Sequence, residues 1–346
     1  MEIKSLGNSH FTRKRVIMRI DSDVDIEKNK ILDDTRLLSS GESLQNLHKR
    51  KCFVTLIGHL GRPDGVDSLY SLLPIAEWYG KYLNKPITQA ADAFGGWFIG
   101  KNIRLLENIR FFVEEEKNDT HFAKELASLG EIFINEAFAV SHRAHASTVG
   151  ITRYLPSYAG IHFEKEVKVL KNVLQHPKRP LVVIIGGAKI ETKLPMVEKM
   201  HSVADFVLVG GEVADHTREL IKVQHSSLPN RKSIVLVAEL TDDKLDITKQ
   251  STENFIQVLQ TAKSIVWNGP LGKTGHDPVT EQGTRLLADA IAHSHAYTIV
   301  GGGDTISYLK QHKLLDKFSF VSVGGGAMLE FLSGRTLPAI IPLLKQ

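Results

Sequence analysis

Charged side chains that could bind a small anion follow apolar runs in the first half of the chain. Asp21 follows VIMRI, and Arg110 and Arg143 come after IRLLEN and IFINEAFAVSH. The run FVTLIG leads to His59 and Arg62. Ligands of open parallel sheets bind beyond the carboxyl ends of the strands, and a guanidinium pairs bidentately with phosphate or carboxylate. The pattern predicts a site for a small molecule that carries both groups.

Glycine-rich turns dominate the second half. Five of six apolar runs there end in glycine or a glycine-containing turn, namely LVVIIGG, FVLVGG, SIVWNGP, YTIVGGGD and FVSVGGG, whereas SIVLVAE does not. Glycine between a strand and a helix lets backbone N–H groups approach an anion, and the helix N-terminus favours negative charge. One such turn could serve only as a tight connection, but the set predicts a site for a phosphate chain.

Charged residues beside these glycines could complete a phosphate site. Lys189 and Lys193 follow the first glycine pair and stand four residues apart, so both ammonium groups can lie on one face of a helix. Asp304 follows the GGG run at an expected helix start. Its carboxylate could cap that helix or hold a magnesium ion that a nucleotide brings, and the sequence leaves both alternatives open.

Two familiar nucleotide motifs are incomplete. Gly272-Lys273-Thr274 resembles the end of a P-loop, but Trp267 occupies the position of its first glycine. Ile306 and Leu329 likewise stand where the last glycine of a G-x-G-x-x-G motif would be. A dinucleotide-dependent dehydrogenase is therefore disfavoured.

Length and composition predict a soluble protein of two domains. A chain of 346 residues is long enough for two hydrophobic cores. Its 42% hydrophobic and 24% charged residues are typical of globular proteins, and no apolar stretch is long enough to cross a bilayer. The net charge of +4 comes from dispersed basic residues, which argues against a nucleic-acid partner. The lone Cys52 and the absence of a signal-like amino terminus predict a cytoplasmic location.

Alternating strand-like and helix-like segments predict an α/β fold with parallel sheets. In the middle of the chain, FEKEVKVLKNVL has helical spacing that ends before Pro177. We therefore expect an interdomain helix over 161–177 between domains at 1–160 and 178–330, with a tail over 331–346 that packs back on the first domain. The acidic run 114–116 is expected to be a solvated helix start without chemistry.

The chain resembles phosphoglycerate kinases from about Arg19 to Pro338. The resemblance is carried, in order, by RIDSDV, DDTRL, GHLGRP, LLENIRF, INEAFAVSHRAHAST, GGAKIETK, VWNGPLG, VGGGDT and SVGGGAMLE. It implies two Rossmann-like domains joined by a helix and hinge, with an acid substrate on the first and a nucleotide on the second. It also implies reversible phosphoryl transfer between 1,3-bisphosphoglycerate and ADP, as in glycolysis, with magnesium. We expect a monomer.

The resemblance also implies roles for individual residues. The acid, 3-phosphoglycerate or its acyl phosphate, would be held by Asp21, Asp23, Arg36, His59, Arg62, Arg110 and Arg143. The phosphates of ADP or ATP would be held by Gly187, Lys189, Lys193, Gly211, Asn268, Gly302, Gly303, Asp304 and Thr305, with Asp304 as the magnesium ligand. The transferring phosphoryl group would be stabilised by Arg36, Lys189, Gly303 and Gly326.

The chain departs from the family pattern at several positions. Asp23 stands where the family has asparagine, so a carboxylate replaces an amide donor beside an anionic substrate. Gly275 stands where the family has an acidic ribose contact, and Asp277 could either replace that acid or serve only in a surface loop. The segments GGEVADHT and LDITKQS also differ from the family, and the interval between them is short.

Two alternatives follow from these departures. One is a pseudoenzyme or binding protein that keeps the anion site but binds nucleotide poorly, and the other is a kinase for a different small carboxylic acid.

His142 and His145 are expected to be structural, because an ionised acyl acceptor needs no general base. Trp97 and Trp267 are expected in the core or the wall of a site.

Overall fold

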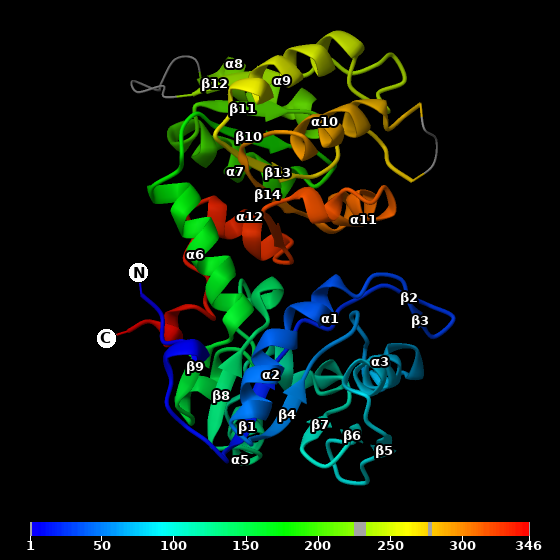
Figure 1. Cartoon of the computed structure of the whole chain (residues 1–346), viewed down its shortest axis with the longest axis vertical. Coiled ribbons are helices and arrows are strands. Elements are labelled where there is room, and N and C mark those ends of the chain that lie inside the picture. Colours follow the sequence, from blue (N-terminus) through cyan, green and yellow to red (C-terminus); the bar gives the residue numbers. More distant parts are fainter. Residues whose placement is uncertain (1, 225–232, 276–278, 346) are drawn as a thin grey trace. The chain divides into compact units, whose positions relative to one another are not determined.

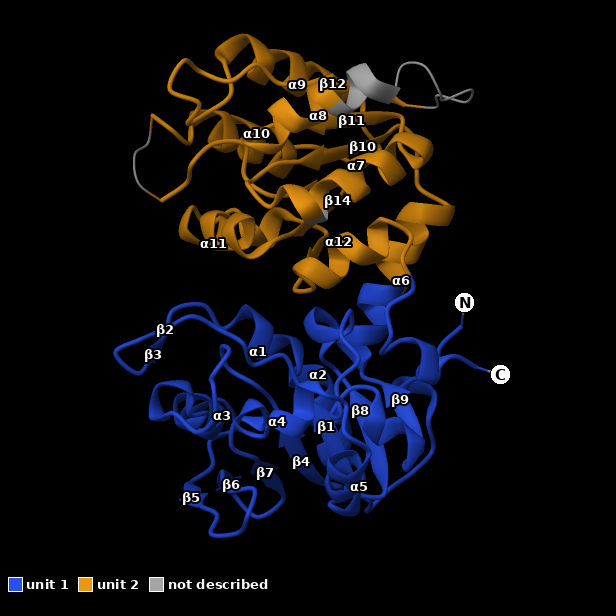
Figure 2. Ribbon diagram, turned by 180° about the vertical axis from the view of Figure 1, so that it is seen from behind, with its two compact units in different colours: residues 1–167, 336–346 blue, residues 168–335 orange. Residues whose placement is uncertain are grey.

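The computed structural model describes residues 2–224, 233–275 and 279–345 (Figure 1). The chain forms two compact units (Figure 2), unit 1 with Met1–Val167 and Thr336–Gln346 and unit 2 with Lys168–Arg335. Helix α6 (Ile161–Gln175) carries the chain from the first unit to the second. The boundary thus falls inside this helix, and the chain returns to unit 1 at residue 336 rather than at 331.

Unit 1 contains a seven-stranded sheet with the order β5-β6-β7-β4-β1-β8-β9. The strands are β1 (Arg15–Arg19), β4 (Phe53–Ile57), β5 (Ile87–Gln89), β6 (Trp97–Ile99), β7 (Ile103–Leu105), β8 (Ile132–Asn135) and β9 (Ser157–Ala159). Strands β7, β4, β1, β8 and β9 run parallel, while β6 is antiparallel to both its neighbours. The parallel strands therefore have the order of a doubly wound sheet, which reverses between β1 and β8.

Helices cover both faces of this sheet. They are α1 (Thr35–Ser39), α2 (Gly41–Lys49), α3 (Leu73–Leu83), α4 (Val113–Glu116) and α5 (Thr120–Ser128), and a small hairpin joins β2 (Ile26–Glu27) to β3 (Lys30–Ile31). Val16 and Met18 join one core cluster with α2 and α3. Ile17 joins another with α5, because successive strand residues point to opposite faces.

Unit 2 contains a six-stranded, fully parallel sheet with the order β12-β11-β10-β13-β14-β15. The strands are β10 (Leu181–Ile185), β11 (Phe206–Val209), β12 (Ile234–Val237), β13 (Ser264–Asn268), β14 (Tyr297–Gly301) and β15 (Phe320–Ser322). The central strands are continuous apolar runs because both of their faces are covered. The order reverses between β10 and β13, where doubly wound sheets bind their ligands.

The helices of unit 2 mostly begin just after glycine-containing turns. They are α7 (Ile190–Val203), α8 (Val213–Gln224), α9 (Lys249–Thr261), α10 (Gln282–Ala292), α11 (Gly303–Gln311) and α12 (Gly326–Leu332). Side chains of α9, α10 and α11 pack with Val182, Ile184 and Trp267 in one core cluster. The predicted α/β class with parallel sheets in both halves is confirmed.

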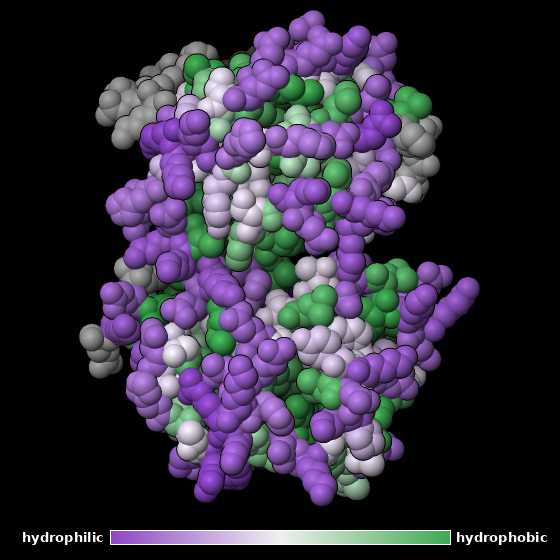
Figure 3. Space-filling model, in the orientation of Figure 1, coloured by the Kyte–Doolittle hydropathy of each residue, from purple (hydrophilic) through white to green (hydrophobic). Residues whose placement is uncertain are grey.

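The carboxyl-terminal segment after residue 335 packs within unit 1. Leu337, Ile340 and Leu343 are buried, and Leu344 pairs with Ile3 near the amino terminus. Trp97 and Trp267 are buried, as expected. On the surface, hydrophilic residues cover much of the face drawn in Figure 3. Among the described residues, no helix is both long and apolar enough to cross a membrane.

Candidate functional site

The carboxyl ends of the parallel strands in unit 1 bring basic side chains together. His59 follows β4, Arg110 lies in a short 3-10 helix after β7, and Arg143 lies beyond β8. Arg19, Arg110 and Arg143 all act electrostatically on His59, as does His145. We call His59, Arg36, Arg110 and Arg143, together with Arg62, the basic cluster. Arg62 is exposed and makes no hydrogen bond or ion pair to any other described residue.

Arg110 has an unused donor in a buried place. The residue is 7% exposed, its Nη1 atom donates to the carbonyl oxygen of Gly61 at 2.5 Å, and its Nε lies 3.0 Å from Glu116 Oε1. Its buried Nη2 atom has no hydrogen-bond partner among the described residues. Burial lowers the pKa of Arg110, while Glu116 acts in the opposite direction. A buried guanidinium donor without a partner suits an anionic ligand.

Asp23 lies among these cations. Its Oδ1 accepts a hydrogen bond from Gly61 N at 2.9 Å, and its Oδ2 lies 3.7 Å from His59 Nε2. Arg36, on α1, donates to the main-chain oxygen of Asp23. The carboxylate that replaces the family's asparagine is thus hydrogen-bonded, and it offsets part of the positive charge around the site.

Asp21 is buried where the strand order of unit 1 reverses. Its Oδ2 accepts a hydrogen bond from Ala139 N at 2.9 Å, so it joins the loop after β1 to the loop after β8. Burial raises the pKa of Asp21 to about 6, although the Ala139 hydrogen bond and the charge of Arg36 oppose this shift. The group is therefore an ionised hydrogen-bond acceptor at pH 7.

The expectation that the acidic run 114–116 is solvated is wrong for Glu115. This side chain is 0% exposed. Its Oε2 and Oε1 accept hydrogen bonds from Ser147 N at 2.9 Å and Ser147 Oγ at 2.6 Å, and His145 Nδ1 lies 3.6 Å from Oε1. Three consecutive glutamates carry no signal that singles out the middle one. His142 Nε2 accepts from Arg143 Nε at 3.2 Å, so both histidines take part in local pairing.

The glycine turns of unit 2 gather at the carboxyl edge of its sheet, after β10, β11, β13, β14 and β15. Gly187 and Gly302 have φ values of +83° and +96°, a region that favours glycine. A Cβ on Gly211 would lie 2.7 Å from the backbone nitrogen of Gly187. The first two turns therefore approach so closely that only glycine fits.

Lys193 spans the reversal point of this second sheet. Its ammonium group donates to the carbonyl oxygen of Gly186 after β10, and it lies 3.2 Å from both Asn268 O and Asn268 Oδ1 at the end of β13. Burial lowers the pKa of Lys193 to about 8, with Asp304 opposing and Lys189 adding to the shift. Lys189 is exposed at the start of α7. The two ammonium groups therefore differ in exposure, although Lys189 still acts electrostatically on Lys193.

The start of α11 faces open space. Nothing lies within 4 Å of the position that a Cβ on Gly303 would take, and Asp304 is exposed in the first turn. Thr305 Oγ1 accepts from Gly269 N at 3.0 Å, which ties this helix to the turn after Asn268. Gly326 is exposed at the start of α12.

The donor set near α11 fits a magnesium ion that is held mainly by phosphates. Within the described ranges, no group of three or more His, Cys, Asp or Glu residues could hold a metal. Magnesium bound with a nucleotide needs only one or two protein carboxylates, because phosphate oxygens and water supply the remaining ligands. The exposed carboxylate of Asp304 is suited to that role.

A second carboxylate lies beside Gly275. This glycine is exposed, and its nitrogen donates to Glu281 Oε2 at 3.1 Å. Glu281 follows six residues later at the start of α10, and no local sequence pattern points to its contact with Gly275. Asp277 lies outside the described residues, as does part of the short interval before LDITKQS.

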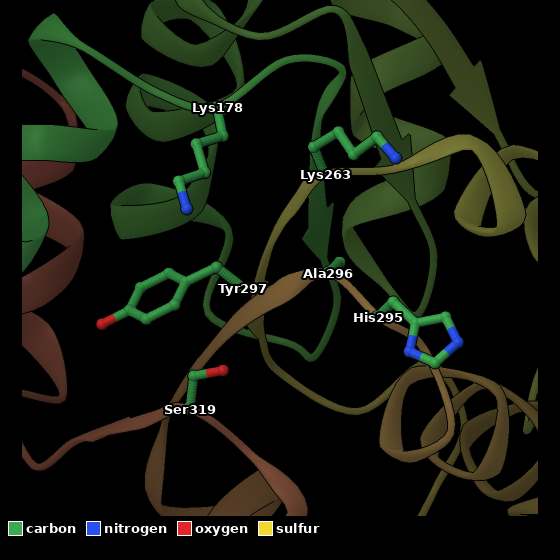
Figure 4. A pocket seen from close by; sticks show the side chains of 6 residues that line it. All are labelled: Lys178, Lys263, His295, Ala296, Tyr297 and Ser319. Carbon is green, nitrogen blue, oxygen red and sulfur yellow. The ribbon is translucent and has the colours of Figure 1, made fainter.

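A depression of about 410 Å³ lies at the opposite edge of the unit 2 sheet (Figure 4). It is lined by Lys178, Lys263, His295, Ala296, Tyr297 and Ser319. These residues precede or begin strands β10, β13, β14 and β15. The depression is therefore at the amino ends of the strands and is separate from the glycine turns.

Comparisons with known proteins agree over the whole chain. A family model described as phosphoglycerate kinase matches residues 6–219 and 215–335. A phosphoglycerate kinase of Borrelia garinii subsp. bavariensis is 36% identical over 394 residues, with 100% of both chains covered. One of Thermosynechococcus vestitus is 35% identical, with 99% of this chain and 98% of the relative covered.

Solved structures agree as well. The phosphoglycerate kinase from Coxiella burnetii has a TM-score of 0.82 and 33% identity, with 99% of both chains covered. The one from Pyrococcus horikoshii OT3 has a TM-score of 0.84 and 26% identity, with 99% of this chain and 98% of that chain covered.

The comparisons also bear on the short interval and on the alternatives. The alignment with the Borrelia relative is 394 residues long, against 346 in this chain, so it includes positions that this chain lacks. The family match is split at 215–219, within α8 and next to the short interval.

The pseudoenzyme alternative finds no support in these relatives. On both sequence and fold, the chain belongs to the phosphoglycerate kinase family, and it is a phosphotransferase.

Proposed function

We propose that the protein catalyses reversible transfer of a phosphoryl group between 1,3-bisphosphoglycerate and ADP, which gives 3-phosphoglycerate and ATP. The observation that carries this proposal is that one chain has two sheets whose strands end, at their carboxyl ends, in groups that can bind anions, and that these groups differ in chemistry between the two sheets. Unit 1 presents guanidinium and imidazole groups, whereas unit 2 presents glycine amides with lysines and one exposed carboxylate. The first suits a small phosphorylated acid and the second a phosphate chain with its metal.

In unit 1, the basic cluster would hold the carboxylate and phosphate of the acid. The Nη2 atom of Arg110, which has no partner in the described part of the chain, is the donor best prepared for an anionic oxygen. Asp21, ionised above pH 6, would accept a hydrogen bond from the substrate hydroxyl. Arg36 would neutralise charge on the transferring phosphoryl group.

In unit 2, the amides of Gly187, Gly211, Gly302 and Gly303 would approach the nucleotide phosphates, with Lys189 and Lys193 as counter-charges. Asn268 and Thr305 would shape the turn beneath them. Asp304 would hold magnesium, which neutralises charge on the phosphate oxygens when it is bound. Lys189, Gly303 and Gly326 would stabilise the transferring group.

The reaction asks for positioning and charge neutralisation rather than covalent help from the protein. The acyl acceptor is already ionised and needs no general base, and in-line transfer depends on holding two ligands in register. We further propose a cytoplasmic, monomeric enzyme, in keeping with its single, buried Cys52. A kinase for another small carboxylic acid remains the second candidate, because Asp23 replaces an amide donor at the acid site.

A coupled assay with ATP, magnesium and 3-phosphoglycerate tests the main proposal, with calorimetric titration of each ligand in parallel. Arg36→Ala should lower kcat by about 1,000-fold, the smallest effect typical of an arginine that stabilises transferring phosphoryl charge. Arg153→Ala, which removes an exposed arginine elsewhere in unit 1, is the matched control and should leave turnover unchanged. Absence of turnover and of nucleotide binding in the unaltered protein would refute the proposal. Turnover with another acid from a panel would establish the second candidate.

A further inference from the structure

A row of buried polar side chains lies behind His59 in unit 1. It consists of Arg19, at the end of β1, with Ser147 and Glu115. Arg19 is 1% exposed, and its guanidinium makes four hydrogen bonds, the longest of which runs from Nη1 to the carbonyl oxygen of Ile57 at 3.5 Å. Nε donates to Ser147 Oγ at 2.9 Å, Nη1 donates to the carbonyl oxygen of Ile20 at 2.6 Å, and Nη2 lies 3.0 Å from His59 Nδ1.

The chemistry of arginine gives the last of these hydrogen bonds a direction. A guanidinium has only donors, so Nδ1 of His59 must be the acceptor and carries no proton. A neutral imidazole with an unprotonated Nδ1 carries its hydrogen on Nε2. His59 Nε2 lies 3.7 Å from Asp23 Oδ2, which is too far for a hydrogen bond. Its N–H therefore remains available to a ligand.

The surroundings keep His59 neutral. The side chain is 2% exposed. Burial lowers its pKa well below the ordinary value, and the positive charges of Arg19, Arg110 and Arg143 lower it further. Asp23 is the carboxylate near the ring, and it does not reverse this effect.

Glu115 and Ser147 hold Arg19 from the other side. Ser147 Oγ accepts from Arg19 and in turn donates to Glu115 Oε1 at 2.6 Å. Burial raises the pKa of Glu115, but His145, the charge of Arg19 and the hydrogen bond from Ser147 outweigh it, so the pKa ends below the ordinary value. The carboxylate therefore stays ionised and compensates the buried guanidinium, as a charge removed from water requires.

We propose that Arg19 is a positioning residue for the acid site. Held by Ser147 and Glu115, it keeps His59 as the neutral Nε2–H tautomer, which donates that hydrogen to an anionic oxygen of the substrate acid. Every hydrogen bond in the row has one possible direction. Glu115 only accepts, so Ser147 must donate to it, and Arg19 only donates, so Ser147 Oγ and His59 Nδ1 must both accept from Arg19. The proposal rests on the proposed function only for the identity of the acid.

Ring nitrogen NMR of the full-length protein tests this inference. The protein is labelled with ¹⁵N in its histidine rings, and the His59 signals are assigned by comparison with His59→Gln. In the unaltered protein without ligand at pH 7, we expect a proton on Nε2 and none on Nδ1. A proton on Nδ1, alone or with one on Nε2, would overturn the proposal. The tautomer is measured on the unaltered protein, so the result does not depend on whether variants of Arg19, Ser147 or Glu115 fold.

A double variant tests whether Arg19 is the cause. Arg19→Met with Glu115→Gln removes both buried charges together, so that neither is left unpaired. Glu115→Gln alone keeps Arg19 and its hydrogen bond to His59, and it controls for the loss of the carboxylate. Because it leaves the guanidinium without its compensating charge, its folded state is first checked by the dispersion of its NMR spectrum. We expect both tautomers of His59 in the double variant and one in the control, with affinity for 3-phosphoglycerate about ten-fold weaker in the double variant. A single Nε2–H tautomer in the double variant would show that Arg19 does not set it.

The two proposals fail in different ways. The tautomer is measured without substrate, so it can be established even if no turnover is found, and that pair of results would refute the proposed function alone. Full turnover together with an Nδ1–H tautomer would refute the role of Arg19 and leave the proposed function intact.

Discussion

Replacing the buried Asp21 by asparagine should change how the stability of unit 1 depends on pH. Burial raises the pKa of this carboxyl group to about 6 from the ordinary 3.8. Between these two values the folded protein keeps the proton that the unfolded chain has already lost. By linkage, the contribution of Asp21 to stability falls as pH rises through this window and levels off above pH 6.

The size of the effect follows from the two pKa values. At about 1.4 kcal/mol per pKa unit, the ionised carboxylate costs about 3 kcal/mol of folding free energy at pH 7.5 and about 1 kcal/mol at pH 4.5. Asparagine keeps an oxygen for the hydrogen bond from Ala139 but does not titrate. The difference in stability between Asp21→Asn and the unaltered protein should therefore shift by about 2 kcal/mol in favour of the variant from pH 4.5 to pH 7.5.

Urea unfolding at the two pH values measures this shift. Trp78 and Trp97 lie in unit 1 and Trp267 lies in unit 2, so all proteins carry Trp267→Phe and the remaining fluorescence follows the unit that contains Asp21. Asp64→Asn, which alters an exposed carboxylate in the same unit, is the matched control and should show no such shift. Any fixed amount by which burying the asparagine amide changes the free energy of unfolding is the same at both pH values and cancels in the comparison. If Asp21→Asn differs from the unaltered protein by the same amount at both, the burial argument is refuted.

Three further outcomes are expected. Asp23→Asn should bind 3-phosphoglycerate about ten-fold more tightly, because it removes a carboxylate beside an anion, and unchanged affinity in calorimetry would contradict the repulsion argument. Lys193 has a pKa of about 8, so ADP binding at pH 8 should take up protons as phosphate favours the charged ammonium. Calorimetry in buffers of different ionisation enthalpy measures that uptake, which Lys193→Met should abolish. Gly302→Ala should destabilise unit 2 by about 1 to 3 kcal/mol in urea unfolding, since its φ is +96°. Gly303→Ala, with open space around the added carbon, should not.

Much of the fold could be predicted because its signals are local. Apolar runs such as LVVII and FVLV form buried parallel strands, and the glycines that end them mark the strand-to-helix turns. The antiparallel strands β5 and β6 were not predicted. Each has only three residues, so neither shows a usable alternation of polar and apolar positions.

The candidate sites could be predicted in outline but not in detail. Residues that follow parallel strands meet at one edge of the sheet, which is why the basic cluster could be anticipated. The orientation of Lys193 could not, because its ammonium is held by carbonyl oxygens of Gly186 and Asn268, the second of which is 75 residues away. Glu281 was missed for a similar reason, since its contact with Gly275 depends on the path of a loop.

By itself, the sequence determined the α/β class, the glycine turns that follow the parallel strands of unit 2, and membership of a kinase family, because these depend on local patterns and on ordered motifs. Only the tertiary structure decided which charges are buried and in which direction each hydrogen bond runs. Arg19, Glu115 and Ser147 come from three distant segments, yet together they determine the proton position on His59. Desolvation and pairing act through space, so residues that look alike along the chain acquire different charge states once the chain has folded.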